Sequence, residues 1–215
     1  MGRLLVIEGL DGAGKRTLAD GLTKALHDAG ATVTTLAFPR YGKSVHADLV
    51  REALHRGHGD LADSVYGMAL LYALDRREAV EEIRRDLELH DIVLLDRYVA
   101  SNAAYGAARL HQDAGGEFVR WVRELEIDRF GLPVPDVQLL LRVAPEVAAA
   151  RAERRARSEA GRVKDAFESD DDLQTRCARV YDQLAGEAWL CPWRVVDGTG
   201  AFDPAELAGV VSSPG

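Results

Sequence analysis

The chain has 215 residues, of which 47% are hydrophobic and 29% are charged, and it carries two cysteines and a net charge of −8. This composition is ordinary for a soluble globular protein and excludes intrinsic disorder, collagen-like repeats, a disulfide-stapled scaffold and a cysteine-rich zinc site. The acidic balance argues against nucleic acid or an anionic membrane as the main partner. No targeting segment and no apolar run near the roughly 18 residues of a membrane span is visible, so we expect a cytoplasmic protein with no membrane partner.

Apolar runs alternate with helical patterns along the chain. The runs predicted to be strands cover residues 4–7, 32–38, 92–95, 137–143 and 193–196. The first predicted helix has Leu18, Leu22 and Leu26 on one face, and a short helix follows around Val45 and Leu49. A long helix is predicted over residues 60–87, and two more helices before about Phe130. The last three are a helix from Pro145, one over 170–189 and a tail helix from Asp203. This alternation is typical of an α/β doubly wound, five-stranded parallel sheet flanked by helices, here as a single domain over residues 1–215.

Ligands of such sheets bind beyond the carboxyl ends of the strands, where residues 8–17, 38–41 and 96–98 fall. The first segment contains Gly9-Leu10-Asp11-Gly12-Ala13-Gly14-Lys15, which matches the phosphate-loop pattern GxxxxGK between a strand and a helix. The glycines let backbone N–H groups point at phosphate oxygens, the helix start adds partial positive charge, and Lys15 reaches the β- and γ-phosphates. We therefore predict a P-loop NTPase fold.

The sequence departs from that pattern after the lysine. Arg16 stands where a Mg²⁺-binding Ser or Thr is usual, and Thr17 follows one place later. Asp96 closes the third apolar run, the position of a Walker-B carboxylate that holds Mg²⁺ directly or through water. Arg97 follows and is expected to project into the same crevice. The alternative for this Asp-Arg pair is a cap at the end of the strand.

The nature of the phosphate acceptor is the next question. A signalling GTPase is excluded, because Asn102 is the only asparagine and an NKxD guanine-reading motif is therefore impossible. A monophosphate acceptor is already anionic and needs cations rather than a strong base. Arg97, Arg40 and the cluster over residues 151–164 suit that task, although the cluster taken alone is more typical of a solvated helix.

Taken together, these residues resemble the thymidylate kinase family, and most of all its actinobacterial form. The matching segments are the phosphate loop with Asp11, Phe38-Pro39-Arg40-Tyr41, Tyr72-Ala73-Leu74-Asp75-Arg76, Asp96-Arg97-Tyr98-Val99-Ala100-Ser101-Asn102 through Tyr105, Gly131-Leu132-Pro133 with Pro135-Asp136, the arginine-rich region, and Asp165 with Glu168. The resemblance implies ATP-dependent phosphorylation of dTMP to dTDP with Mg²⁺, and a homodimer.

The resemblance also implies roles for individual residues. The catalytic residues would be Lys15, Asp11, Arg97 and Arg155. ATP would bind at Gly9, Leu10, Asp11, Gly12, Ala13, Gly14, Lys15, Arg16, Thr17, Arg151 and Arg155. The substrate dTMP would bind at Asp11, Phe38, Arg40, Tyr41, Tyr72, Arg76, Arg97, Ser101, Asn102, Tyr105, Asp165 and Glu168. The metal ligands would be Asp11, Asp96 and Glu168.

Within those sets, the phosphate of dTMP would lie among Phe38, Arg40, Tyr41 and Arg97. Tyr72 would stack on thymine, Arg76 and Asn102 would hydrogen-bond its edge, and Tyr105 would crowd the 2′ position of the sugar. A helical, arginine-rich lid over about residues 147–165 would close over ATP. Two alternatives remain open: a P-loop kinase acting on a deoxynucleoside or a different monophosphate, and a regulatory P-loop ATPase that transfers no phosphate to a nucleotide.

Overall fold

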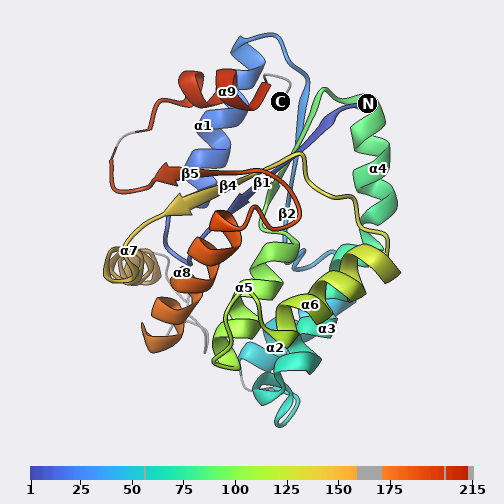
Figure 1. Cartoon of the computed structure of the whole chain (residues 1–215), viewed down its shortest axis with the longest axis vertical. Coiled ribbons are helices and arrows are strands. Elements are labelled where there is room, and N and C mark those ends of the chain that lie inside the picture. The colour runs from blue at the N-terminus through green and yellow to red at the C-terminus, as the bar shows by residue number, and fades with distance from the viewer. Residues whose placement is uncertain (56, 159–170, 201, 213–215) are drawn as a thin grey trace.

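Five parallel strands form one sheet in the order β2-β3-β1-β4-β5 (Figure 1). The computed structural model describes residues 1–55, 57–158, 171–200 and 202–212. The strands are β1 (Arg3–Glu8), β2 (Val33–Ala37), β3 (Ile92–Asp96), β4 (Val137–Arg142) and β5 (Trp193–Asp197). The predicted sheet is confirmed, and every strand end lies within one residue of its expected position.

The register of the sheet brings the first and third strands together at their carboxyl ends. Ile7 of β1 pairs with Asp96 of β3, while Glu8 pairs with Leu140 on the other side. Most residues of β1, β3 and β4 are buried, as expected of parallel strands covered on both faces. The glycine-rich loop after Glu8 and the segment after Asp96 therefore begin side by side.

The helices connect the strands and cover both faces of the sheet. They are α1 (Lys15–Asp28), α2 (Val45–Leu54), α3 (Val65–Glu78), α4 (Val80–Leu89), α5 (Val99–Arg109), α6 (Glu117–Arg123), α7 (Pro145–Ser158), α8 (Asp171–Gly186) and α9 (Pro204–Ser212), with a 3₁₀ turn η1 (Leu61–Asp63) and a π-helix η2 (Glu124–Arg129). Helices α1 and α9 pack together on one side, and α5 and α8 pack together on the other (Figure 1). In the described part of the chain, no helix is long and apolar enough to cross a membrane.

The long helix expected over residues 60–87 is wrong as a single element, because the structure has η1, α3 and α4 there. The break between α3 and α4 lies at Ala79, whose N–H bonds to the carbonyl of Arg76, three residues back, at 3.1 Å. The carbonyl of Asp75, the partner in an unbroken helix, accepts instead from Nη2 of Arg40 at 2.8 Å. A side chain from the loop after β2 thus takes the place of one helical hydrogen bond.

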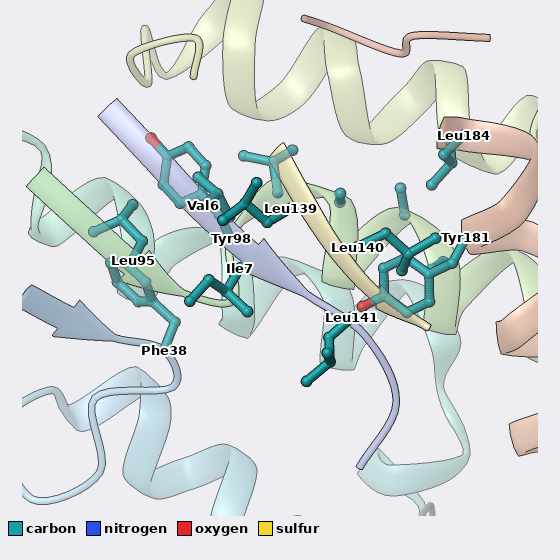
Figure 2. Packing of buried hydrophobic residues seen from close by; sticks show 14 of the residues in the cluster. Val6, Ile7, Phe38, Leu95, Tyr98, Leu139, Leu140, Leu141, Tyr181 and Leu184 are labelled. Atoms are coloured by element: carbon teal, nitrogen blue, oxygen red, sulfur yellow. The ribbon is translucent and has the colours of Figure 1, made fainter. Parts of the chain in front are cut away.

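The core lies between the sheet and the helices of both layers. Ile7, Leu95 and Leu139 from the central strands meet aromatic side chains from the loops and helices (Figure 2). Tyr98, at the start of α5, is fully buried and packs against Phe38 at a ring distance of 6.1 Å. Tyr181 of α8 is buried as well. These two tyrosines fix the helical layer on the side of the sheet where the predicted site residues gather.

Candidate active site

The loop between β1 and α1 has the backbone that its glycines predict. Gly12 and Gly14 adopt left-handed conformations, with φ of 80° and 103°, which side-chain-bearing residues rarely adopt. Leu10 and Ala13 turn their side chains into the core. The polar backbone of the loop is consequently left to face a ligand, with the N-terminus of α1 directly behind it.

Lys15 closes this loop from its C-terminal end. Its side chain is buried, and Nζ donates to the carbonyls of Gly9 at 3.2 Å and Leu10 at 2.9 Å. Burial lowers the pKa of Lys15 to about 8, and the nearby charge of Arg97 lowers it further, while carboxylates such as Asp11 oppose the shift. The ammonium group therefore lies in the cradle as a partly desolvated charge that an incoming phosphate would stabilise.

Asp11 and Arg97 form an ion pair across the mouth of the loop. Nη2 of Arg97 donates to Asp11 Oδ1 at 2.6 Å, and the hydroxyl of Tyr105 donates to Asp11 Oδ2 at 2.8 Å. Burial opposes ionisation of Asp11, but Arg97 and Lys15 outweigh it and lower its pKa to about 2. Asp11 is thus a fixed negative charge that orients Arg97, and the guanidinium lies over the ring of Tyr105 at 5.4 Å.

The backbone at Arg97 is strained in a way that serves this arrangement. Its φ of 68° lies in the left-handed region, although the residue is not glycine, and such residues gather at functional sites. The N–H of Arg97 bonds to the carbonyl of Ile7 at 2.9 Å, which ties the turn to β1. Nη1 then donates to the hydroxyl of Ser101 at 3.0 Å.

Glu8, which sequence reasoning missed, holds the start of α5. The side chain is fully buried and accepts from the N–H groups of Tyr98 and Ser101, from the Ser101 hydroxyl at 2.6 Å and from the Tyr181 hydroxyl at 3.0 Å. Burial raises the pKa of Glu8 despite these bonds and the charge of Arg97. A carboxylate that ends an otherwise apolar strand was the signal available in the sequence.

A pocket opens next to this cluster. Its lining contains Asp11, Phe38, Pro39, Tyr41, Tyr72, Arg76, Arg97, Ser101, Asn102 and Tyr105. All of these except Pro39 were predicted substrate-binding residues. The charged groups Asp11 and Arg97 lie at the phosphate-loop end, and Arg76 and Asn102 lie among the aromatic side chains. One pocket therefore combines an end with charged groups and an end that has aromatic surface and hydrogen-bonding groups.

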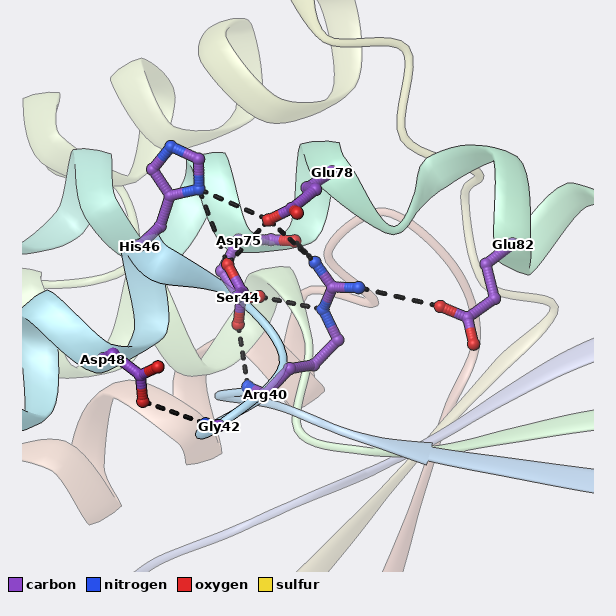
Figure 3. A network of polar contacts seen from close by, with 8 residues as sticks. All are labelled: Arg40, Gly42, Ser44, His46, Asp48, Asp75, Glu78 and Glu82. Atoms are coloured by element: carbon purple, nitrogen blue, oxygen red, sulfur yellow. Dashed lines mark hydrogen bonds and ion pairs between the residues drawn. The ribbon is translucent and has the colours of Figure 1, made fainter.

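Arg40 does not belong to that lining among the described residues. Its backbone N–H and Nε donate to the two oxygens of Asp75, and its guanidinium reaches Glu78 at 3.3 Å and Glu82 at 3.6 Å (Figure 3). The structure therefore places this guanidinium in a cluster of carboxylates where α3 ends and α4 begins. These carboxylates compensate its charge, so Arg40 fixes the loop that carries Phe38 rather than presenting a free cation to the pocket.

Arg151 of α7 links the phosphate loop to the segment after β5. Nη1 of Arg151 donates to the carbonyl of Ala13 at 3.0 Å, and Nη2 donates to the carbonyl of Gly198 at 2.9 Å. A Cβ placed on Gly12 would lie 2.1 Å from the carbonyl oxygen of Ala148. Arg151 thus braces the loop in this structure. The side chain of Arg155 and residues 159–165 of the expected lid lie outside the described residues, as do Asp165 and Glu168.

This approach of Gly12 to α7 predicts a loss of stability on substitution. Gly12→Ala needs an unfavourable φ and must also displace α7, so we expect it to lower the free energy of unfolding by about 2–4 kcal/mol. Gly30→Ala is the matched control, because Gly30 has a similar φ of 89° and no described atom lies within 4 Å of its Cβ position. This substitution should lower the free energy of unfolding by only about 1–2 kcal/mol. Urea unfolding of both variants measures the difference, and equal losses would contradict the contact.

The predicted metal ligands have different surroundings. Oδ1 of Asp96 is buried at the end of β3 and has no hydrogen-bond partner among the residues that the structure describes. The carboxylate is close enough to raise the pKa of Lys15 against the effect of burial. Arg16 and Thr17 are exposed on the first turn of α1. Among the described residues, no group of three or more potential metal ligands is assembled. The unpaired oxygen of Asp96 is the atom that a hydrated Mg²⁺ would satisfy.

Comparison with known proteins agrees with the family resemblance of the sequence motifs. The family model of thymidylate kinase matches residues 7–196. The chain is 52% identical over 211 residues to the thymidylate kinase of Mycobacterium tuberculosis strain H37Rv, with 98% of each chain covered. It is 38% identical over 185 residues to the thymidylate kinase of Xanthomonas oryzae pv. oryzae strain PXO99A, which covers 85% of this chain and 72% of that protein.

Proposed function

The chain belongs to the thymidylate kinase family and catalyses the ATP-dependent phosphorylation of dTMP to dTDP, and we propose that the pocket beside the phosphate loop is its dTMP site. The observation that carries this assignment is the position of Arg97. Its guanidinium lies in the pocket and is bonded to Asp11 of the loop that binds ATP. A phosphate on Arg97 therefore lies next to the phosphates held by the loop.

The reaction requires positioning and charge stabilisation more than proton transfer. A dTMP phosphate is anionic near neutral pH, so its oxygen attacks the γ-phosphorus of ATP without a strong base. Arg97 holds the acceptor, while Lys15 and the loop N–H groups hold the β- and γ-phosphates. Asp11 keeps Arg97 oriented, because its low pKa leaves it ionised throughout the physiological range. Charge moving onto the bridging oxygen of ATP is stabilised by Lys15.

Mg²⁺ supplies charge neutralisation on the ATP phosphates when it is bound. In our proposal, Asp96 would hold it directly or through water with Oδ1, which has no partner in the described part of the chain, and Asp11 would contribute from the loop. Mg²⁺ usually keeps several waters, so one or two protein oxygens suffice. The missing hydroxyl after Lys15 is then no obstacle to metal binding. Glu168, the third predicted ligand, lies outside the described residues.

The apolar end of the pocket would hold the base and sugar. Phe38 and Tyr72 supply aromatic surface there, and Arg76 and Asn102 supply polar groups. Tyr105 also lines the pocket, with its hydroxyl bonded to Asp11 and its ring beside the guanidinium of Arg97. We propose that it occupies the space of a ribose 2′-hydroxyl, which would favour deoxyribonucleotides.

A nucleotide panel with ATP and Mg²⁺ tests the assignment. We expect ADP release with dTMP, weaker activity with dUMP, and little activity with dCMP, with thymidine or without acceptor. Excess EDTA should abolish the reaction, and added Mg²⁺ should restore it. Activity with thymidine in place of dTMP would indicate a deoxynucleoside kinase, and ADP release independent of acceptor would indicate a regulatory ATPase.

The pKa of Lys15 predicts how the reaction depends on pH. Because the pKa in the free enzyme is about 8, only the fraction that remains protonated above that pH can receive ATP productively. We expect kcat/KM for ATP to fall about tenfold per unit above pH 8, since this parameter reports the free enzyme. At saturating ATP the bound phosphates raise the pKa of Lys15, so kcat should fall only at higher pH. A flat kcat/KM up to pH 9.5 would contradict this prediction.

Two further expectations concern assembly and location. We propose a homodimer through the long helices, and the large apolar side chains exposed on neighbouring helices support it. They include Tyr66 and Leu70 of α3 and Val45 of α2, which are exposed by 42%, 41% and 64%. Sedimentation of wild type and Leu70→Asp would test this surface, with a shift toward monomer expected for the variant. We also propose that the enzyme acts in the cytoplasm.

A further inference from the structure

We propose that Glu126 is a positioning residue that sets the preference of the pocket for thymine over cytosine. The proposal rests on the function above and concerns a residue that does not line the pocket among the described residues. Glu126 lies behind the two polar side chains of the apolar end. Its side chain is fully buried, and both of its carboxylate oxygens are used to hold those two side chains.

The first of these side chains is Arg76, which is 3% exposed. Its Nε donates to Glu126 Oε2 at 2.5 Å and its Nη2 donates to Oε1 at 2.8 Å. Burial alone would lower the pKa of Arg76, but the carboxylate of Glu126 outweighs it and raises the pKa above the ordinary value. This two-bond pairing fixes the plane of the guanidinium. The third nitrogen, Nη1, has no partner among the described residues and is the donor left for a ligand.

The second side chain is Asn102, which is 6% exposed. Its Nδ2 donates to the carbonyl of Ala69 at 3.0 Å and to Glu126 Oε1 at 2.8 Å. Both neighbours are acceptors, so the opposite orientation would place the amide oxygen of Asn102 against two other oxygens. The orientation of this amide is therefore determined by its surroundings. Its oxygen, which has no partner in the described part of the chain, becomes an acceptor for the ligand.

Glu126 is held at its place by the backbone around it. It belongs to the π-helix η2, and the bonds from Phe130 to Leu125 and from Gly131 to Ile127 close the end of that element at 3.0 and 3.1 Å. The carbonyl of Glu126 accepts from Leu132 at 3.1 Å. A π-helical turn shifts the side chains relative to an α-helix, and such turns are frequent at functional sites. This geometry directs Glu126 toward α3 and α5.

The result is a fixed hydrogen-bonding pattern of one donor and one acceptor. Thymine offers the complement, because its O4 accepts and its N3–H donates. Cytosine offers the reverse, with a donating amino group and an accepting N3. A buried donor facing another donor costs more than a missing contact. Since Glu126 decides which groups of Arg76 and Asn102 remain free, it specifies the base without touching it.

The test replaces the carboxylate with an amide of the same size. In Glu126→Gln, the new NH₂ group faces a donor of Arg76 or Asn102, so either the pairing breaks or Asn102 turns over and offers a donor to the base. We expect the ratio of kcat/KM for dTMP to that for dCMP to fall by tenfold or more. The ratio for dTMP to dUMP should stay within about twofold, because uracil has the same hydrogen-bonding edge as thymine.

The controls separate this role from a structural one. Glu124→Gln removes the same charge from an exposed position of the same π-helix and should leave both ratios unchanged. Glu126→Asp keeps the buried charge but shortens the side chain by one methylene, and it replaces the amide variant if that variant does not fold. The ratio of kcat/KM for dTMP to that for dCMP should fall in Glu126→Asp too. A folded Glu126 variant that loses activity equally toward all three nucleotides would overturn the proposal. Wild type that does not phosphorylate dTMP would instead overturn the proposed function.

Discussion

Lys15→Ala is expected to lower kcat on the order of a thousandfold while the protein stays folded. The reason is that Nζ lies at the start of the loop, within 3.2 Å of the carbonyls of Gly9 and Leu10, in the space where β- and γ-phosphates would bind. Removal of one preorganised charge that stabilises a developing negative charge has an effect of this size. Steady-state rates of ADP formation with dTMP measure it, and circular dichroism reports the fold.

The control for Lys15 is a lysine on the same helix. Lys24 of α1 is exposed and, within the described part of the chain, pairs only with Asp28, four residues on, so Lys24→Ala should keep the wild-type rate. A Lys15→Ala enzyme within tenfold of the wild-type kcat would show that the ammonium group does not act on the transferred phosphoryl group. The loop would then bind ATP through its backbone alone.

Arg97→Ala is expected to lower kcat/KM for dTMP by a hundredfold to a thousandfold. The guanidinium lies in the pocket between Asp11 and Ser101, and in our proposal it holds the acceptor phosphate in line with ATP. Its loss also leaves the carboxylate of Asp11 facing the anionic substrate. Both effects act on dTMP, so the KM for ATP should change much less than the rate.

Two variants sharpen the test of Arg97. Arg97→Lys keeps the charge but loses the two-pronged contact with Asp11 and Ser101, so we expect partial activity between wild type and Arg97→Ala. Arg194→Ala removes an exposed arginine of β5 and should leave kcat/KM for dTMP unchanged. If Arg97→Ala keeps normal affinity and rate with dTMP, the residue is a strand cap, and the acceptor phosphate binds elsewhere.

The fold and the ligand-binding edge of the sheet could be predicted from local patterns. Apolar runs fixed the strands, and the glycine-rich loop between a strand and a helix pointed to Lys15. Family resemblance added residues such as Tyr72 and Tyr105, which lie far apart in the sequence and meet in one pocket. These features are encoded by residue type and spacing, or by a recognisable order of motifs.

The residues that hold the pocket residues in place could not be predicted in the same way. Glu8 and Glu126 are single carboxylates, and each acts through buried side chains or backbone groups that are distant in the sequence. The partners of Glu8 lie 90 or more residues away, and those of Glu126 lie 24 and 50 residues away. Arg40 has the residue type of a phosphate ligand, but three carboxylates from α3 and α4 surround it. The break after α3 likewise depends on Arg40, which bonds to the backbone carbonyl of Asp75. Charge compensation of this kind appears only when the helices are placed in space.

The central place of β1 in the sheet has a consequence for protein synthesis. Residues 3–8 are synthesised before their strand partners, which belong to β3 (residues 92–96) and β4 (residues 137–142). The loop that follows accepts a hydrogen bond from Arg151, which also bonds to the carbonyl of Gly198. Glu8 accepts a hydrogen bond from the hydroxyl of Tyr181. A nascent chain therefore carries its phosphate-binding segment without these contacts until Gly198 has been added. Cellular ATP, which stabilises only the state that binds it, would accordingly favour chains that contain these partners over chains that stop before them.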